Sequence, residues 1–255
     1  MLNSLVYKNP SRAKKELGIS YLGSVNFTAK HAKAFNFNEL TYALYLSPAN
    51  TSGYEVCPKR NTECTIACLH ESGYNKIDVK ENSINKSRIK KTKLFFENRD
   101  FFMNLLISEI KSAKNKALNE NYDFSVRLNN VSDVNPERFR LNDKNILEIF
   151  QETKFFDYTK VISRLALVKK YPNYDLTFSY NGENWDECQE ALKNNVRVAV
   201  VFKDKLPEEY NGIKVISGDE YDMRYRDPTN VIVGLKFKKV RNKINFESSK
   251  FVVSV

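Results

Sequence analysis

The sequence predicts an α/β protein, built as a partial or complete (β/α) barrel of about six to seven mostly parallel strands. The first observation is that strand-like and helix-like segments alternate through the second half of the chain, as they do in βαβ units. The second is the segment VRVAVVF over 196–202, whose nearly continuous apolar run is typical of a strand buried on both faces. An open doubly wound sheet is the alternative, although neither a GxGxxG nor a GxxxxGK[ST] motif supports it.

The expected elements follow from hydrophobic periodicity, taken in order along the chain. Apolar and aromatic residues predict a strand over 40–46, and apolar residues at helical spacing predict a helix over 95–118. Further strands are expected over 123–130, 154–160, 174–181, 196–202, 213–217 and 231–237, and further helices over 143–153, 161–171 and 183–195.

These elements predict a single α/β domain over 40–240, with a cysteine-containing loop over 54–74. Residues 1–39 are expected to form an extension packed on the domain, and 241–255 a C-terminal strand or tail. No apolar run approaches the roughly 20 residues that a membrane span needs, and the N-terminus lacks an apolar signal core. The sequence therefore predicts a soluble protein of the cytoplasm (of the host cytosol if it is viral) without a membrane partner.

The chain is basic, with 41 lysine and arginine residues against 31 acidic residues and a formal net charge of +10. Such a balance favours acidic partners, nucleotide or nucleic acid first. Segment 76–93 carries seven basic residues against two acidic ones. An ordinary solvated basic surface is the alternative. The residues expected to contact phosphates are Lys86, Arg88, Lys90, Lys91 and Lys93.

Polar residues follow the predicted strands, and parallel strands of this architecture bring their carboxyl ends to one edge. The predicted cofactor-binding residues are Arg127, Asn129, Asp133, Ser179 and Asn181. The predicted catalytic residues are Lys160, Glu183 and Asp222. Lys160 would hold a carboxylate or phosphate of the substrate as a point charge. Glu183 or Asp222 would serve as the proton carrier. Taken singly, each of these residues also reads as an ordinary loop residue or helix cap.

Three of the four cysteines lie within twelve residues, at the spacing C-x6-C-x3-C: Cys57, Cys64 and Cys68. Helical spacing places Cys64 and Cys68 on one face, and Cys57 approaches from the preceding loop. Three thiolates predict an iron–sulfur cluster with one iron left open. Zinc is the alternative, with His70 or Cys188 as the fourth ligand. Buried or redox-active thiols without a metal are the third possibility.

The string LSPANTSGYEVCPKRNTECTIACLHESG resembles the Cys-Pro…Cys-x3-Cys stretch of a phage and plasmid family. That family is named after the product of gene eighty-eight of a mycobacteriophage. The resemblance extends over roughly residues 40–238, implies a phage context and implies no particular reaction. Shorter similar pieces occur in the same order at 87–102, 126–133, 155–160, 176–184 and 219–238.

The order of strand, cysteine loop and βα units is also similar to that of radical S-adenosylmethionine enzymes. This wider resemblance implies a partial barrel with a [4Fe-4S] cluster on three cysteines, and S-adenosylmethionine as a further cofactor. The spacing departs from that superfamily's usual C-x3-C-x2-C, and LNNVSD stands where its glycine-rich methionine-binding stretch would be.

Three function hypotheses follow. The first is an iron–sulfur enzyme of radical type that modifies a nucleotide or nucleic acid. The second is a zinc-stabilised, basic nucleic-acid-binding protein of replication or regulation. The third is a virion or other structural component.

Overall fold

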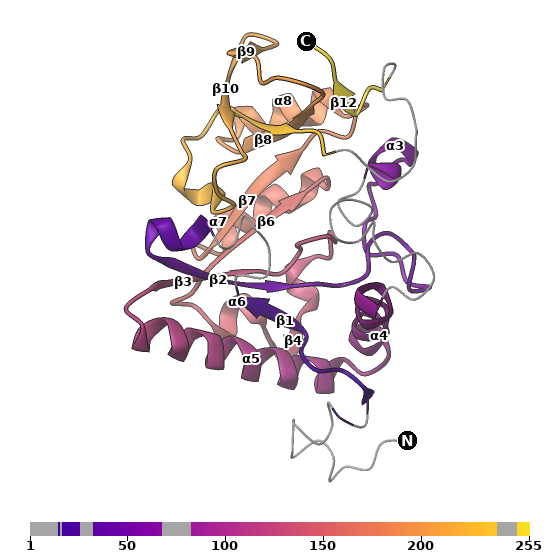
Figure 1. The fold of residues 1–255 in the computed structure, drawn as a ribbon, viewed down its shortest axis with the longest axis vertical. Helices are drawn as coiled ribbons and strands as arrows, with labels where there is room; N and C mark the ends of the chain where they lie inside the picture. Colours follow the sequence, from indigo (N-terminus) through magenta and orange to yellow (C-terminus); the bar gives the residue numbers. More distant parts are fainter. Residues whose placement is uncertain (1–14, 16, 26–32, 68–82, 239–248) are drawn as a thin grey trace.

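The computed structural model of the chain describes residues 15, 17–25, 33–67, 83–238 and 249–255. One large mixed sheet runs through the molecule in the order β1-β2-β3-β6-β7-β8-β11-β10-β9, and β12 also pairs with β8 (Figure 1). All pairs from β2 across to β10 are parallel, and β1 and β9 are antiparallel edges. The strands are β1 (Gly23–Val25), β2 (Glu39–Leu44), β3 (Asp123–Arg127), β6 (Lys154–Thr159), β7 (Tyr174–Ser179), β8 (Arg197–Phe202), β9 (Glu209–Tyr210), β10 (Ile213–Ser217), β11 (Ile232–Lys236) and β12 (Val252–Val253).

Helices connect the parallel strands. The α-helices are α3 (Thr62–Ile66), α4 (Ser83–Glu97), α5 (Arg99–Asn119), α6 (Ile146–Ile149), α7 (Leu165–Lys170) and α8 (Trp185–Lys193). Short 3-10 helices are η2 (Lys33–Phe37), η5 (Pro136–Arg138), η6 (Ile162–Arg164) and η7 (Arg224–Arg226), and β4 (Arg140–Leu141) pairs with β5 (Lys144–Asn145). Within the described residues, no helix is long and apolar enough to cross a membrane.

The α/β class and the mostly parallel sheet are confirmed. The complete barrel is not found: over the described part of the chain the sheet remains open, with β1 at one edge and β9 at the other. Strand β11 lies between β8 and β10, so the sheet does not follow chain order at that end.

The helix expected over 95–118 is in fact two helices, α4 and α5. Asn98 interrupts the helical path, and its side-chain oxygen accepts a hydrogen bond from the backbone N–H of Phe101 at 3.4 Å. An asparagine at this position satisfies an N–H that would otherwise lack a partner at the start of α5. The first of these helices, α4 (Ser83–Glu97), includes most of the basic segment.

One face of the sheet carries the apolar core. Val126, Phe155 and Leu176 pack in one cluster with residues of α5 and with Leu167 of α7. Phe178 and Val198, which are direct register partners on β7 and β8, pack in a second cluster that includes α8 residues. Since side chains alternate along a strand, these two clusters cover a single face.

The opposite face, called here the polar face, is defined by Arg127, Tyr158, Thr177 and Arg197. Tyr158 is the register partner of Thr177, and Thr177 that of Arg197. The guanidinium of Arg127 lies 4.8 Å from the centroid of the Tyr158 ring. Segment 221–227, which includes η7, packs over this face and supplies charged partners to it.

Candidate functional site

The loop after β2 folds back on itself around Cys57. The backbone N–H of Val56 donates to the carbonyl of Ala49 at 3.0 Å, and the N–H of Ala49 donates to the Cys57 sulfur at 3.4 Å. Ala49 has a positive φ of 53°, a conformation uncommon for a residue with a Cβ. The closed loop thus directs a backbone N–H at a half-buried cysteine sulfur.

Helix α3 presents Cys64 half-buried from the following turn. The side chain of Asn61 caps this helix, accepting from the N–H of Cys64 at 2.8 Å. Cys64 packs against Phe251 in the C-terminal segment, whereas Cys57 packs against the large core cluster.

Cys68 and His70 lie outside the described residues. Among the residues that are described, no group of three histidine, cysteine or carboxylate side chains has the geometry of a metal site. The three-cysteine centre therefore stays a prediction.

The cysteine loop contacts the segments that follow β3 and β7. The N–H of Asp133 donates to the carbonyl of Val56 at 2.8 Å. The side-chain amide of Asn61 donates to the carbonyl of Asn181 at 2.7 Å. In Figure 1, α3 lies on the side of the molecule toward which the parallel strands point. Three loops that are distant in sequence thus meet at the carboxyl edge of the sheet.

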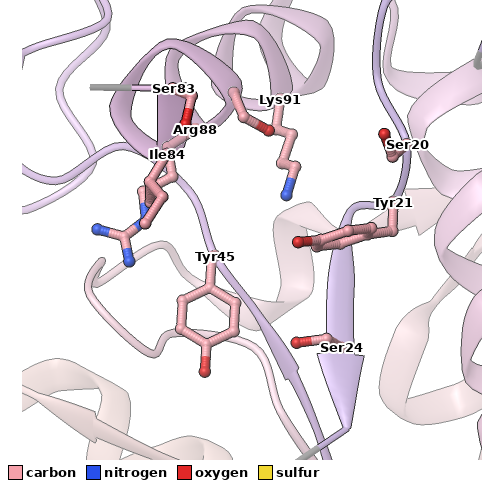
Figure 2. A pocket seen from close by; sticks show the side chains of 9 residues that line it. Ser20, Tyr21, Ser24, Tyr45, Ser83, Ile84, Arg88 and Lys91 are labelled. Carbon is pink, nitrogen blue, oxygen red and sulfur yellow. The ribbon is translucent and has the colours of Figure 1, made fainter. Parts of the chain in front are cut away.

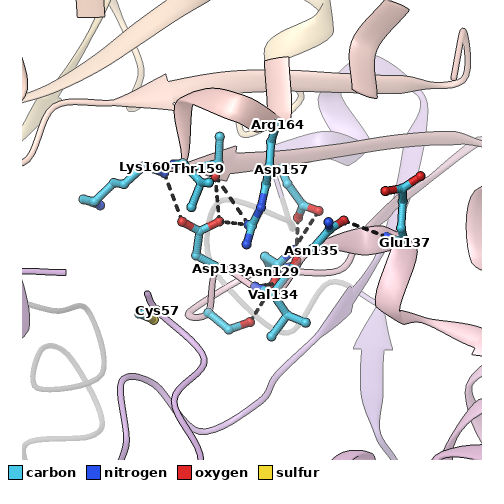
Figure 3. Close-up of polar contacts among 12 residues, drawn as sticks. Cys57, Asn129, Asp133, Val134, Asn135, Glu137, Asp157, Thr159, Lys160 and Arg164 are labelled. Carbon is cyan, nitrogen blue, oxygen red and sulfur yellow. Dashed lines mark hydrogen bonds and ion pairs between the residues drawn. The ribbon is translucent and has the colours of Figure 1, made fainter. Parts of the chain in front are cut away.

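Asp133 organises this edge (Figure 3). Its carboxylate accepts from the hydroxyl of Thr159 at 2.8 Å and from the backbone N–H of Lys160 at 3.0 Å. The guanidinium of Arg164 forms a buried ion pair with the same carboxylate. Asp133 therefore fixes the backbone from which the half-buried Lys160 projects.

Asn129 stabilises the loop after β3 through its side-chain hydrogen bonds. Its side-chain oxygen accepts from Ser132 and Val134, and its amide donates to the carbonyl of Val134 and to Asp157. These bonds occupy the side chain and shape the loop that carries Asp133. Asn129 thus helps to hold the loop that carries Asp133 in place at the carboxyl edge.

Asp157 is 2% exposed, accepts two hydrogen bonds from Asn129, and accepts one from the Tyr174 hydroxyl. Burial raises the pKa of Asp157 to about 7, although hydrogen bonds from Asn129 and the charge of Arg127 act in the opposite direction.

The segment after β7 holds the other expected residues. Asn181 is half-buried, and its side-chain oxygen accepts from the N–H of Glu183 at 2.9 Å. Glu183 is exposed, and Ser179 is buried at the end of β7. The N–H of Asn181 donates to the side chain of Asn184 at 2.8 Å. Asn181 and Asn184 therefore shape this turn, and Glu183 faces solvent from it.

Two other predicted residues pair with each other. Arg127 and Asp222 form a buried ion pair on the polar face. Burial raises the pKa of the neighbouring Tyr158. Tyr158 Oη and Thr177 Oγ1 are buried and lack a hydrogen-bond partner among the described residues. Arg127 and Asp222 are therefore buried within the protein, whereas Lys160 is half-buried and Glu183 is exposed.

The five basic residues expected to contact phosphates divide between two sides of α4. Lys86, Lys90 and Lys93 are exposed, at the i, i+4 and i+7 spacing of one helix face. Arg88 and Lys91 are 5% and 3% exposed. The exposed basic row therefore consists of three lysines.

Cys188 lies in the core and not at the edge. It is fully buried in α8 among apolar residues, and burial raises its pKa to about 12. Its position fits the small apolar role that helix periodicity predicts, rather than that of a fourth zinc ligand.

Sequence reasoning missed Arg164 and Asp157. Arg164 falls within a segment expected to be an ordinary helix, and Asp157 stands between Phe156 and Tyr158 inside a strand. An aspartate between two aromatic residues of a buried strand is a detectable signal, because a buried carboxylate requires hydrogen-bond partners.

Comparison with known proteins gives one family. A protein-family model described as "Gene product 88" matches residues 8–253. Neither the search of curated proteins nor the search of solved structures gives a match.

Proposed function

The chain belongs to the gene product 88 family over residues 8–253, and from this premise we propose that it is an iron–sulfur enzyme acting on a nucleotide or nucleic acid. The matched residues include the cysteine loop and the loops after β3, β6 and β7, so a single family model covers all of these loops. One observation carries the proposal: the loop that holds Cys57 is hydrogen-bonded to Asp133, which also holds the backbone of Lys160.

The architecture is consistent with part of a (β/α) barrel. Helices α5, α7 and α8 pack on one face of consecutive parallel strands, whereas a doubly wound sheet has helices on both faces. In barrels of this kind the reacting groups lie on the loops after the strands. The edge formed by the cysteine loop, Asp133, Lys160 and Glu183 is the corresponding place in this protein.

One described contact supports a thiolate-ligated centre at Cys57. Cys57 accepts a backbone N–H, and hydrogen bonds to ligating sulfurs are among the features that tune iron–sulfur clusters. Cys57, Cys64 and Cys68 would hold the cluster, which would supply one-electron chemistry when bound. The proposal includes S-adenosylmethionine as a second cofactor. Zinc, held by the same cysteines, is the alternative metal.

The chain's own residues have separate roles in this proposal. Asp133 and Arg164 hold the β6 loop rigid, and the Lys160 ammonium binds a substrate phosphate or carboxylate. Glu183, exposed at the rim, exchanges protons with solvent. Asp222, committed to Arg127 in the interior, keeps that arginine charged and positioned. The proposal also places the protein in the reducing cytosol, because ligating thiols must remain reduced.

Metal analysis of protein purified without oxygen tests the proposal. We expect a brown protein that absorbs near 400 nm and contains iron and acid-labile sulfide. Cys57→Ala and Cys64→Ala should lose the colour, and Cys188→Ala, the matched control from the core, should keep it. Colourless protein with one zinc per chain would contradict the enzyme proposal and support the alternative, a zinc-stabilised nucleic-acid-binding protein. Colourless, metal-free protein would contradict both the iron–sulfur and the zinc hypotheses, and a structural role would remain.

A further inference from the structure

A pocket of about 230 Å³ lies between α4, β1 and the end of β2, separate from the Asp133 edge. Its nine described lining residues comprise two cations, two tyrosines, four serines and one isoleucine (Figure 2). They are Ser20, Tyr21, Ser24, Tyr45, Ser83, Ile84, Ser87, Arg88 and Lys91. The lining thus combines positive charge with hydroxyl groups.

The two cations are buried yet reach the pocket. Arg88 is 5% exposed and Lys91 is 3% exposed. The Arg88 guanidinium lies 5.5 Å from the centroid of the Tyr45 ring, and the Lys91 ammonium lies 4.6 Å from that of Tyr21. Figure 2 shows Lys91 extending from α4 toward Tyr21, and Arg88 lying on the side of Tyr45 that faces away from Tyr21. Aromatic faces attract cations, so the tyrosines hold both charged groups at the pocket wall.

The remaining walls add hydrogen-bond donors. Ser83 and Ser87 come from the first turns of α4, whose first turn contains no acidic residue. The start of a helix carries partial positive charge and backbone N–H groups without helical partners. Across the pocket, Ser24 Oγ is buried and has no hydrogen-bond partner among the described residues. Several donors thus converge on a space bordered by two cations.

We propose that this pocket binds a terminal phosphate group, carried by a free nucleotide or by the end of a nucleic-acid strand. The oxygens of a phosphomonoester dianion accept hydrogen bonds from guanidinium, ammonium and hydroxyl donors, and its negative charge is attracted to the cations of the lining. The volume lies below the roughly 300–1,000 Å³ of sites that enclose a drug-sized ligand, so the pocket takes the phosphate and leaves the carrier outside. Tyr21, 45% exposed, offers its ring at the mouth.

The exposed row Lys86, Lys90 and Lys93 lies on the same helix, and it supports a nucleic-acid carrier by offering further phosphate contacts. The proposal goes beyond the function proposed above and requires no metal. A Cys57→Ala variant that lacks metal is therefore expected to retain phosphate binding, so failure of one proposal can be distinguished from failure of the other.

The variant Ser83→Asp tests the pocket without removing a buried side chain. It places a negative charge at the mouth, and an acidic residue in the first turn is favourable to the helix itself. Ser108→Asp on α5, an exposed serine outside the pocket, is the matched control with the same change in charge. Thermal melts of both variants establish that each remains folded.

Calorimetry with inorganic phosphate, thymidine 5′-monophosphate and thymidine measures recognition of the phosphate. We expect both phosphate compounds to bind and thymidine not to bind. Ser83→Asp should weaken binding by about tenfold or more, since a like charge beside the phosphate is worth at least that factor. Ser108→Asp should match the wild type. Absence of phosphate binding by the wild type, or equal weakening in both variants, would overturn the proposal.

Fluorescence anisotropy with 5′-phosphorylated and 5′-hydroxyl single strands identifies the carrier. A preference for the phosphorylated strand that Ser83→Asp abolishes supports the end of a nucleic acid. Equal affinity for the two strands, together with nucleotide binding that Ser83→Asp abolishes, supports a free nucleotide.

Discussion

Arg127 and Asp222, separated by 95 residues in the sequence, form a buried ion pair on the polar face of the sheet. Arg127 ends β3, and Asp222 lies in the segment that crosses over that face just before η7. The pair therefore attaches the crossing segment to the centre of the sheet. Asp175 and Arg197 form a second pair on the same face at 3.0 Å.

Removing one partner of the Arg127–Asp222 pair is expected to be strongly destabilising. Arg127→Met leaves the Asp222 carboxylate buried without its cation, which should lower the free energy of unfolding by about 3–5 kcal/mol. The double variant Arg127→Met/Asp222→Leu should recover part of that stability. Lys116→Met, which breaks the exposed Lys116–Glu120 pair, is the control and should change stability by less than about 0.5 kcal/mol. Chemical denaturation measures all three, and equal destabilisation for the buried and exposed pairs would contradict this account.

Asp157 should make stability depend on pH between about 4 and 7. Its folded-state pKa of about 7 lies above the ordinary aspartate value of 3.8, mainly because the side chain is buried. The stabilisation linked to its protonated form is complete below pH 4 and is lost as pH rises toward 7. The free energy of unfolding should therefore fall in that window, by at most about 1.4 kcal/mol per pH unit from this group.

The variant Asp157→Asn isolates this contribution. Its unfolding free energy should vary less with pH than that of the wild type from pH 4 to 7, in urea titrations at each pH. Asp204→Asn, at an exposed position, should follow the wild-type profile. Parallel profiles for wild type and Asp157→Asn would show that Asp157 is ionised throughout this range.

Glu63 should hold the C-terminal segment on the cysteine loop. Its carboxylate accepts from the Ser249 hydroxyl at 3.0 Å and from the backbone N–H groups of Lys250 and Phe251 at 3.0 and 2.9 Å. Glu63→Ala is expected to increase hydrogen exchange in β12 at least several-fold, because local opening then no longer breaks these charge-assisted hydrogen bonds. Glu55→Ala, in the same loop but paired with Arg60, should leave β12 protected. Unchanged exchange in the Glu63 variant would assign the attachment of β12 to its pairing with β8 alone.

The Cys188 thiol should be unreactive in the folded protein. It is fully buried, and burial raises its pKa to about 12, so the nucleophilic thiolate is scarce at pH 8. Titration of metal-free protein with a thiol reagent should give a slow class that reacts only after unfolding and that Cys188→Ala removes. The half-buried Cys57 and Cys64 should react before it. Prompt modification of Cys188 under native conditions would show that α8 opens readily.

The three exposed lysines of α4 should contribute to nucleic-acid affinity by binding phosphates. Replacing Lys86, Lys90 and Lys93 with glutamine should weaken binding of single-stranded DNA. It should also reduce the slope of log affinity against log salt by about 0.7 for each phosphate that is no longer neutralised. Fluorescence anisotropy at several salt concentrations measures both quantities.

The matched control for this triple variant removes three exposed lysines elsewhere: Lys169, Lys205 and Lys214. It changes the net charge equally, so a purely global charge effect would weaken both variants alike. Weakening confined to the α4 variant assigns the phosphate binding to that helix.

Much of the fold can be predicted from the sequence, because hydrophobic alternation is a local property. The strands expected over 154–160, 174–181 and 196–202 appear as β6, β7 and β8 with small shifts at their ends. The α4–α5 break was missed, since a single Asn98 between two helical segments gives only a weak local signal. The position of β11 between β8 and β10 was also missed, because strand order depends on contacts between distant segments.

The sequence by itself determined the elements, the basic charge and the order in which polar residues follow the strands, since each depends on neighbouring residues alone. Only the tertiary structure decided which of those residues meet. It attached Asp133 to Lys160, paired Arg127 with Asp222, and turned Arg88 and Lys91 inward while Lys86 remained outside. The physical reason is that side-chain pairing and burial depend on strand register and on packing across the sheet, which join residues far apart in the chain.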